Sequence, residues 1–119
     1  MTYRARQGDI IWLTLDPQAG HEQKGRRPAL VVSNNSFNNF EKSAAMVCPI
    51  TNTDRSNPLH VRLDKRTKTT GVVMCDQAKI LNLEKRCADF IERAPNDIVF
   101  EATDIIGGIV KFKTPAPLA

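Results

Sequence analysis

The sequence lacks the apolar segments that membrane-spanning and secreted proteins need. No hydrophobic run approaches the roughly 20 residues that cross a bilayer. Residues 1–8 hold no apolar signal-peptide core ahead of the first strand-like segment. We therefore expect a cytoplasmic protein that makes no contact with a membrane.

Metal-ligand and disulfide patterns are missing as well. The three cysteines are an odd number without close spacing, and no CxxC or HxxxH pair occurs. Carboxylates are scattered, whereas a metal nuclease gathers several at one point. The sequence therefore predicts no metal site, no cofactor and no disulfide framework. Cys48 and Cys75 stand inside apolar runs and are expected to be small buried hydrophobic residues.

What the sequence does contain is an ordinary globular composition with a basic excess. Its 119 residues fit one compact domain, which we place at residues 1–113, with a flexible tail at 114–119. Seventeen basic and 13 acidic side chains give a net charge of +4, and residues 1–94 hold 15 of the basic ones against 10 acidic ones. This excess favours an anionic partner, nucleic acid first, although the basic run 65–68 is also typical of a solvated face.

Period-two alternation and turn residues predict a mainly β fold. Seven short segments have strand-like composition: residues 9–15, 28–33, 44–50, 60–63, 71–75, 78–81 and 88–92. After Pro95 the apolar spacing becomes helical, with Asn96 as the candidate N-cap, and Gly107-Gly108 should fray the helix end unless a neighbour packs there. The pattern predicts a small, strongly twisted antiparallel sheet or barrel of five to seven strands with one C-terminal α-helix.

Polar residues gather where the predicted strands end, in the first loop (residues 18–27) and after the third and fifth strands. They are His21, Glu22, Arg27, Thr51, Asp76 and Gln77. If these strands are neighbours, the side chains meet in one cationic groove that suits a phosphodiester. Metal-free RNA cleavage needs little more: an acceptor for the 2′-hydroxyl proton, a donor for the leaving oxygen, and donors for the charge on the phosphate.

The same residues also have purely structural explanations. Arg27 could pair with Glu22 or Asp76, and Thr51 could cap its own backbone. Two aromatic residues are expected in the core rather than as stacking platforms: Trp12 and Phe90.

Short motifs stand in a fixed order from Gly8 to the C-terminal helix. They are Gly8-Asp9-Ile10-Ile11-Trp12, Asp16-Pro17, Gly20-His21-Glu22-Gln23, Gly25, Arg27-Pro28-Ala29-Leu30-Val31-Val32-Ser33, Phe37-Asn38, Pro49-Ile50-Thr51 and Gly71-Val72-Val73-Met74-Cys75-Asp76-Gln77. In order and spacing they resemble the MazF/PemK toxin family. The resemblance implies an SH3-like barrel with a C-terminal helix, a homodimer, and a sequence-specific, metal-independent endoribonuclease. It also implies a toxin that a cognate antitoxin holds in check.

The resemblance carries site residues with it. Arg27 matches the family's principal catalytic residue, and Thr51 matches one that helps to stabilise the transition state. His21 and Asp76 match acid–base positions of the PemK/Kid branch, in which an arginine stands where this chain has Met74. We therefore rank Arg27 and Thr51 ahead of the other two. The RNA-binding residues predicted with them are Glu22, Gln23, Lys24, Gln77 and Lys79.

The role expected for Arg27 is a bidentate clamp on the scissile phosphate, because a guanidinium stays protonated and is a poor acid or base. Proton transfer would then fall to His21 or Glu22. Two alternatives to the ribonuclease stay open: a non-enzymatic CcdB-like toxin that binds DNA gyrase, and a non-catalytic nucleic-acid-binding barrel.

The expected partners are single-stranded RNA, a second copy of the chain, and an antitoxin whose acidic, partly disordered segment blocks the groove. Operator DNA would be reached only through the antitoxin. Ile106, Ile109 and Val110 are expected at or near the dimer interface, where Gly107-Gly108 would allow close approach.

Overall fold

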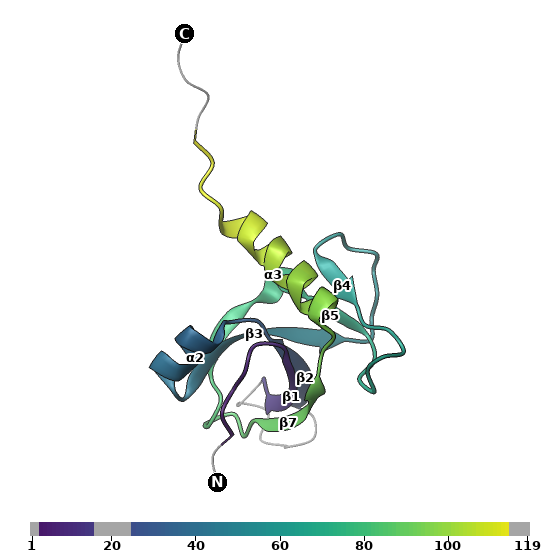
Figure 1. Cartoon of the computed structure of the whole chain (residues 1–119). Coiled ribbons are helices and arrows are strands. Elements are labelled where there is room, and N and C mark those ends of the chain that lie inside the picture. Colours follow the sequence, from purple (N-terminus) through teal and green to yellow (C-terminus); the bar gives the residue numbers. More distant parts are fainter. Residues whose placement is uncertain (1–2, 16–24, 115–119) are drawn as a thin grey trace.

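The computed structural model describes residues 3–15 and 25–114, and within them seven strands form one antiparallel sheet (Figure 1). The strands are β1 (Asp9–Thr14), β2 (Arg26–Val31), β3 (Ala44–Thr51), β4 (His60–Arg62), β5 (Val72–Met74), β6 (Lys79–Asn82) and β7 (Asp89–Arg93). The helical elements are α2 (Asn35–Glu41), the short 3₁₀ turn η2 (Cys75–Gln77) and the C-terminal α3 (Asn96–Val110). The predicted mainly β fold with a C-terminal helix is confirmed.

The strand order leaves this sheet open. It runs β4-β5-β3-β2-β1-β7, and β6 also pairs with β3. Closing a sheet into a barrel requires hydrogen bonds between its first and last strands, and no ladder joins β4 to β7 in the described part of the chain. The expectation of a closed barrel is therefore wrong. The long strand β3 pairs with β5 near its C-terminal end and with β6 near its N-terminal end. The sheet therefore branches at β3, and its outer strands β4 and β7 do not pair with each other.

The three central strands bury both of their faces. Alternate residues of β1, β2 and β3 enter two separate cores, as period two requires. The core beside α3 includes Ile10, Leu30, Cys48, Ile50 and Cys75. The core on the other face includes Ile11, Leu13, Ala29, Val31 and Val47. Cys48 and Cys75 are buried as predicted, whereas Cys87 is exposed.

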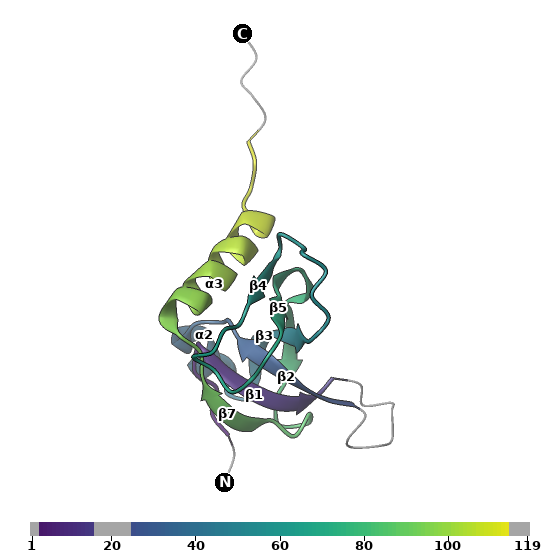
Figure 2. The same cartoon turned by 90° about the vertical axis from the view of Figure 1, so that its right-hand side faces the viewer.

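Helix α3 lies against one face of the sheet, and its C-terminal end leads away from the strands (Figures 1 and 2). Its buried residues, Ile98 and Ala102, join the core. The cap is Pro95 and makes no side-chain hydrogen bond, so the prediction of Asn96 as N-cap is wrong by one residue. The Pro95 carbonyl accepts the first helical bond, from the backbone N–H of Val99 at 3.1 Å, which a proline can do without an N–H of its own.

The helix does not break at its two glycines. It continues through Gly107-Gly108 to Val110, and nothing lies within 4 Å of a Cβ placed on either glycine. Ile109 and Val110 are largely exposed on this last turn. No helix within residues 3–15 and 25–114 combines the length and the apolarity needed to cross a bilayer.

Trp12 and Phe90 do not enter the core, contrary to expectation. Their exposed fractions are 43% and 51%. Trp12 on β1 pairs with Pro28 on β2, two residues along from the buried pair Ile10 and Leu30. It therefore lies beyond the edge of the core beside α3. Its indole faces a surface depression instead.

Candidate active site

The structure describes five of the nine predicted site residues. The described ones are Arg27, Thr51, Asp76, Gln77 and Lys79. The other four lie in residues 16–24, outside the described residues: His21, Glu22, Gln23 and Lys24.

Arg27 and Thr51 lie at the same end of the sheet, on neighbouring strands. The β2–β3 ladder pairs Val31 with Val47 and Ala29 with Pro49 and ends there, two residues before Arg27 and Thr51, while Thr51 pairs with Val72 of β5. The two residues that the sequence ranked first therefore stand at adjacent ends of neighbouring strands.

The guanidinium of Arg27 is exposed and bonds to no other described residue. Its neighbour Arg26 takes the structural role instead: Nη2 pairs with Asp89 Oδ2 at 3.0 Å, and Nη1 donates to the Cys87 carbonyl at 3.1 Å. The alternative in which Arg27 pairs with Asp76 does not occur, since the described part of the chain holds no ion pair between them and the Asp76 carboxylate contacts His60. Consecutive strand residues point to opposite faces, so one arginine ties down the sheet and the next is available to a ligand.

Thr51 is half-buried, and its Oγ1 accepts a hydrogen bond from the backbone N–H of Thr53 at 3.2 Å. The prediction that it could cap its own backbone is confirmed. The bond uses only one lone pair, so the hydroxyl proton remains available for donation. Gly71 packs directly on the Thr51 backbone, because a Cβ at position 71 would lie 2.3 Å from the Thr51 carbonyl oxygen. Thr51 is therefore held from two sides.

A basic loop, residues 65–70, flanks this end of the sheet. Glu92 on β7 accepts bonds from the backbone N–H of Lys68 at 3.0 Å, and from the N–H and the hydroxyl of Thr69, both at 2.8 Å. Burial alone would raise the pKa of Glu92, but these bonds outweigh it and hold that pKa below its ordinary value. The loop is thus fixed by a charged anchor.

Only part of the charge in the basic loop is available to a ligand. Arg66 bonds to Asp64 at 2.8 Å and to Asp97 at 2.9 Å, and its hydrogen bonds lower the pKa of Asp64 to about 2. Lys65 and Lys68 form no ion pair with another described residue. A surface cavity of about 340 Å³ lies between the loop and the exposed indole. Its lining residues are Trp12, Pro28, Asn52, Lys68, Thr69, Thr70 and Ile91. An exposed indole beside cations is a stacking platform for a nucleic-acid base.

Asp76 lies farther along the sheet than Thr51. Thr51 pairs with Val72 on β5, and Asp76 follows four residues later, in η2 beyond the end of that strand. Gln77 and Lys79 are exposed beyond it, on η2 and β6. The structure does not gather the five described residues at one point. It forms two groups: Arg27 with Thr51, and Asp76 with Gln77 and Lys79.

His60 is a site residue that the sequence did not single out. Its Nε2 lies 3.1 Å from Asp76 Oδ1, although the residues are 16 positions apart. The sequence showed β4 only as a short alternating segment, so nothing local marked this histidine. The pairing of β4 with β5 brings the two together.

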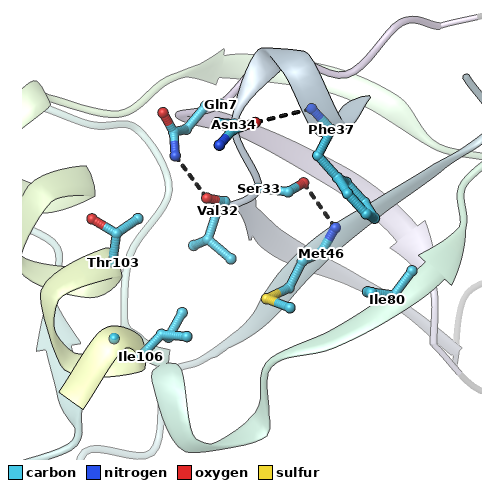
Figure 3. A pocket seen from close by; sticks show the side chains of 10 residues that line it. Gln7, Val32, Ser33, Asn34, Phe37, Met46, Ile80, Thr103 and Ile106 are labelled. Atoms are coloured by element: carbon cyan, nitrogen blue, oxygen red, sulfur yellow. Dashed lines mark hydrogen bonds between the residues drawn. The ribbon is translucent and has the colours of Figure 1, made fainter. Parts of the chain in front are cut away.

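The apolar pocket in Figure 3 lies apart from these groups, between α3, α2 and strands β3 and β6. Its volume is about 310 Å³, and Met46, Ile80 and Ile106 line it together with the side chain of Phe37. Its polar side chains serve the backbone: the Ser33 hydroxyl accepts from the Met46 N–H at 2.9 Å, and Asn34 Oδ1 caps α2 by accepting from the Phe37 N–H at 2.9 Å. Nothing in this lining performs acid–base chemistry.

Thiol and metal chemistry find little support in the described residues. The contact with the Cys75 sulfur, together with burial, raises the pKa of Cys48 and keeps it a thiol. No group of three or more His, Cys, Asp and Glu side chains is placed to hold a metal ion within residues 3–15 and 25–114.

Both the sequence and the fold of this chain match those of known proteins. The family described as PemK-like, MazF-like toxin of type II toxin-antitoxin system matches residues 6–107. The chain belongs to this family.

Its relatives include endoribonuclease PemK of Escherichia coli, 39% identical over 99 residues that cover 80% of this chain and 74% of PemK. Endoribonuclease toxin ChpB of Escherichia coli is 36% identical over 104 residues, which cover 81% of this chain and 85% of ChpB. A crystal structure of MazE-MazF from Deinococcus radiodurans superposes with a TM-score of 0.82 at 32% identity, and covers 93% of this chain and all of that one.

Proposed function

We propose that the chain cleaves single-stranded mRNA at specific sequences, without a metal ion, through attack of a 2′-hydroxyl on the adjacent phosphate. It is an endoribonuclease toxin of a type II toxin–antitoxin system. The observation that supports this mechanism most directly is the exposed guanidinium of Arg27 near the start of β2, on the strand next to β3, which ends at Thr51. An mRNA substrate implies that the toxin acts in the cytoplasm.

The proposed chemistry follows from what these groups can donate. The planar fork of Arg27 binds two phosphate oxygens and stabilises the charge that builds up as the phosphorus becomes pentacoordinate. Thr51, held by Gly71 and by its own turn, donates its hydroxyl proton to the same group. The substrate supplies the nucleophile, so the protein contributes donors and a proton acceptor. His21 or Glu22, with Asp76, are the candidates for proton transfer.

The test compares Arg27→Ala with Arg26→Ala on a long single-stranded RNA in EDTA. Losing a charge-assisted clamp costs roughly 10²–10³ in rate, and Arg27→Lys should not restore it, because a point charge lacks the fork. Thr51→Ala should show a milder loss. Arg26→Ala is the matched control: it breaks the bonds to Asp89 and Cys87, so it should lower the melting temperature while folded protein still cuts RNA.

The result that would contradict the assignment is a folded Arg27→Ala protein that cuts RNA at nearly the wild-type rate. Intact RNA with the wild type, together with inhibited DNA supercoiling, would support the non-enzymatic CcdB-like toxin instead. Intact RNA that still binds tightly would support a nucleic-acid-binding module.

The proposed oligomer is a homodimer formed through the end of α3. Ile109 and Val110 are exposed there, and Ile106 lines the apolar pocket of Figure 3. The open space around Gly107-Gly108 gives a second helix room for close approach. A second copy of the chain would cover this exposed apolar surface.

The proposed antitoxin carries an acidic, partly disordered segment that binds over the site. The Deinococcus radiodurans structure contains a MazE–MazF complex, and the basic body of this chain favours a partner of opposite charge. Affinity should fall as salt rises. A complex indifferent to salt would contradict an interface led by charge. The proposed domain is single and spans residues 1–113; most of its tail lies outside the described residues.

A further inference from the structure

The His60–Asp76 pair is a built feature that the Arg27–Thr51 chemistry does not use. His60 begins β4, and Asp76 stands in η2 beyond β5. The Nε2–Oδ1 distance is 3.1 Å, with the two side chains 10% and 29% exposed. An acceptor-only carboxylate requires the proton on Nε2, so His60 donates and Asp76 accepts.

The other ring nitrogen of His60 does not stabilise the fold in this position. Nδ1 is buried and finds no hydrogen-bond partner among the described residues. A buried polar atom left unpaired lowers the stability of the fold. An apolar side chain would avoid that loss, so fold stability alone does not explain a histidine here. The bond from Nε2 to Asp76 is what the imidazole adds.

The carboxylate of Asp76 is held in place yet still reachable. Cys75, the preceding residue, is 1% exposed in the core and anchors η2. His60 occupies Oδ1, and no hydrogen bond from another described residue reaches Oδ2. Met74 is the register partner of His60 on β5, and its thioether has no N–H to offer the carboxylate. His60 therefore supplies the only side-chain donor to Asp76 among the described residues.

This pair also adjoins the strand that carries Thr51. His60 lines a polar cavity of about 370 Å³, with Val72, the register partner of Thr51, in the same lining. The remaining wall comes from the loop after Thr51, from β4 and from α3: Asp54, Ser56, Asn57, Pro58, Arg62 and Glu101. An RNA strand that follows β3 and β5 away from Thr51 would meet Asp76 within one or two nucleotides.

We propose that His60 is a positioning residue for Asp76 in the RNA site. By donating to Oδ1 it fixes the carboxylate, so that Oδ2 accepts a hydrogen bond from an RNA donor, either a 2′-hydroxyl or a base amino group. This inference rests on the proposed function. It adds that the Asp76 carboxylate binds RNA in one orientation, and that the hydrogen bond from His60 on β4 fixes this orientation.

The experiment uses His60→Phe and His60→Gln in the full-length chain, with cleavage of single-stranded RNA and thermal unfolding measured together. Phe keeps the ring and removes both nitrogens, so the protein should melt at the wild-type temperature or above it. Cleavage should nevertheless fall roughly 10²-fold, as misplacement of a reacting group by about 1 Å can cause. Gln places an amide N–H near the position of Nε2 and should recover most of the rate.

A double-mutant cycle separates positioning from an independent role. Asp76→Asn should lower cleavage about as much as His60→Phe, and the double variant should be no slower than Asp76→Asn alone, because His60 acts through Asp76. A fall in kcat identifies a 2′-hydroxyl as the donor, whereas a higher KM or a changed cutting sequence identifies a base. The control is Asp89→Asn, which breaks a carboxylate pair with the structural Arg26 and should leave cleavage by the folded protein unchanged.

Three outcomes would overturn the inference. They are wild-type cleavage by His60→Phe, a loss that simply follows a lower melting temperature, and additive losses in the double variant. In each of these the wild type still cuts RNA, so the proposed function stands. A wild-type protein that leaves RNA intact would overturn both.

Discussion

Gly71 couples the stability of the fold to the geometry of the site, and Gly71→Ala tests that coupling. Its φ is +115°, a conformation that residues with a Cβ rarely adopt. An added Cβ would lie 2.3 Å from the Thr51 carbonyl oxygen and 2.8 Å from its carbonyl carbon. Both contacts are with backbone, so no side chain can turn aside. Relief requires β3 and β5 to separate where Thr51 pairs with Val72.

The magnitude follows from two contributions. The unfavourable φ costs about 1–3 kcal/mol, and forcing apart a packed backbone contact costs a further 1–3 kcal/mol or so. We expect Gly71→Ala to lower the free energy of unfolding by about 2–6 kcal/mol in total, a large share of the 5–15 kcal/mol typical of a domain. At about 4 °C for each kcal/mol, the melting temperature should fall by roughly 8–24 °C.

The assay combines urea unfolding with RNA cleavage at a temperature where the variant is folded. The comparison of free energies holds if both proteins show the same dependence of the free energy of unfolding on urea concentration. Cleavage should fall even there, because the carbonyl that is displaced belongs to Thr51. Gly108→Ala is the control for stability, since within one chain it adds the same methyl group where nothing lies within 4 Å and should stabilise the helix by up to about 1 kcal/mol. Because Gly108 belongs to the proposed dimer interface, the dimerisation of this variant is measured alongside. A Gly71→Ala protein within about 1 kcal/mol of the wild type and with normal cleavage would refute this reasoning.

Two further predictions concern the loop anchor and the dimer. Glu92→Gln should destabilise by about 1–3 kcal/mol, because an amide oxygen cannot accept all three bonds from Lys68 and Thr69. The pKa of Glu92 is lowered in the fold, so its contribution is complete above the ordinary value of 4.5 and is lost as the pH falls through the folded pKa; the stability gap between wild type and variant should therefore shrink in acid. A gap that persists at low pH would assign the effect to packing instead. Ile109→Asp should convert a micromolar dimer to monomer in sedimentation, and an unchanged sedimentation coefficient would exclude the end of α3 from the interface.

Most of the fold could be predicted because its signals are local. Each of the seven strands carries alternation or an apolar run closed by turn residues, and all seven appear within a few residues of their predicted bounds. The helix follows from the spacing of Ile98, Ala102 and Ile105. The prediction of a closed barrel was wrong because closure depends on pairing between distant strands. No residue in β3 indicates that the two halves of this strand bond to different partners.

The same limit applies to the site. Arg27 and Thr51 stand at adjacent ends of the neighbouring antiparallel strands β2 and β3, and this placement could be foreseen from the sequence. His60 sits in a three-residue strand with nothing to mark it, and its partner lies 16 residues away. Trp12 was assigned to the core because its strand is otherwise buried. The structure is needed to show that the core beside α3 ends before Trp12, so that β1 leaves the core at this residue.

The departures from ordinary folding rules gather around one region. Gly71 has a positive φ and presses on Thr51, His60 buries an unpaired nitrogen beside Asp76, and Trp12 exposes its indole next to Pro28. Each lowers stability in a way that a plain residue at the same position would avoid. Residues that lower stability in this way are expected at surfaces that bind a ligand, where function rather than packing determines the residue. Gly71 contacts β3, Trp12 lies near the end of β1, and His60 lies on β4, which β5 separates from β3. The surface proposed to bind RNA therefore includes residues whose placement lowers the stability of the fold.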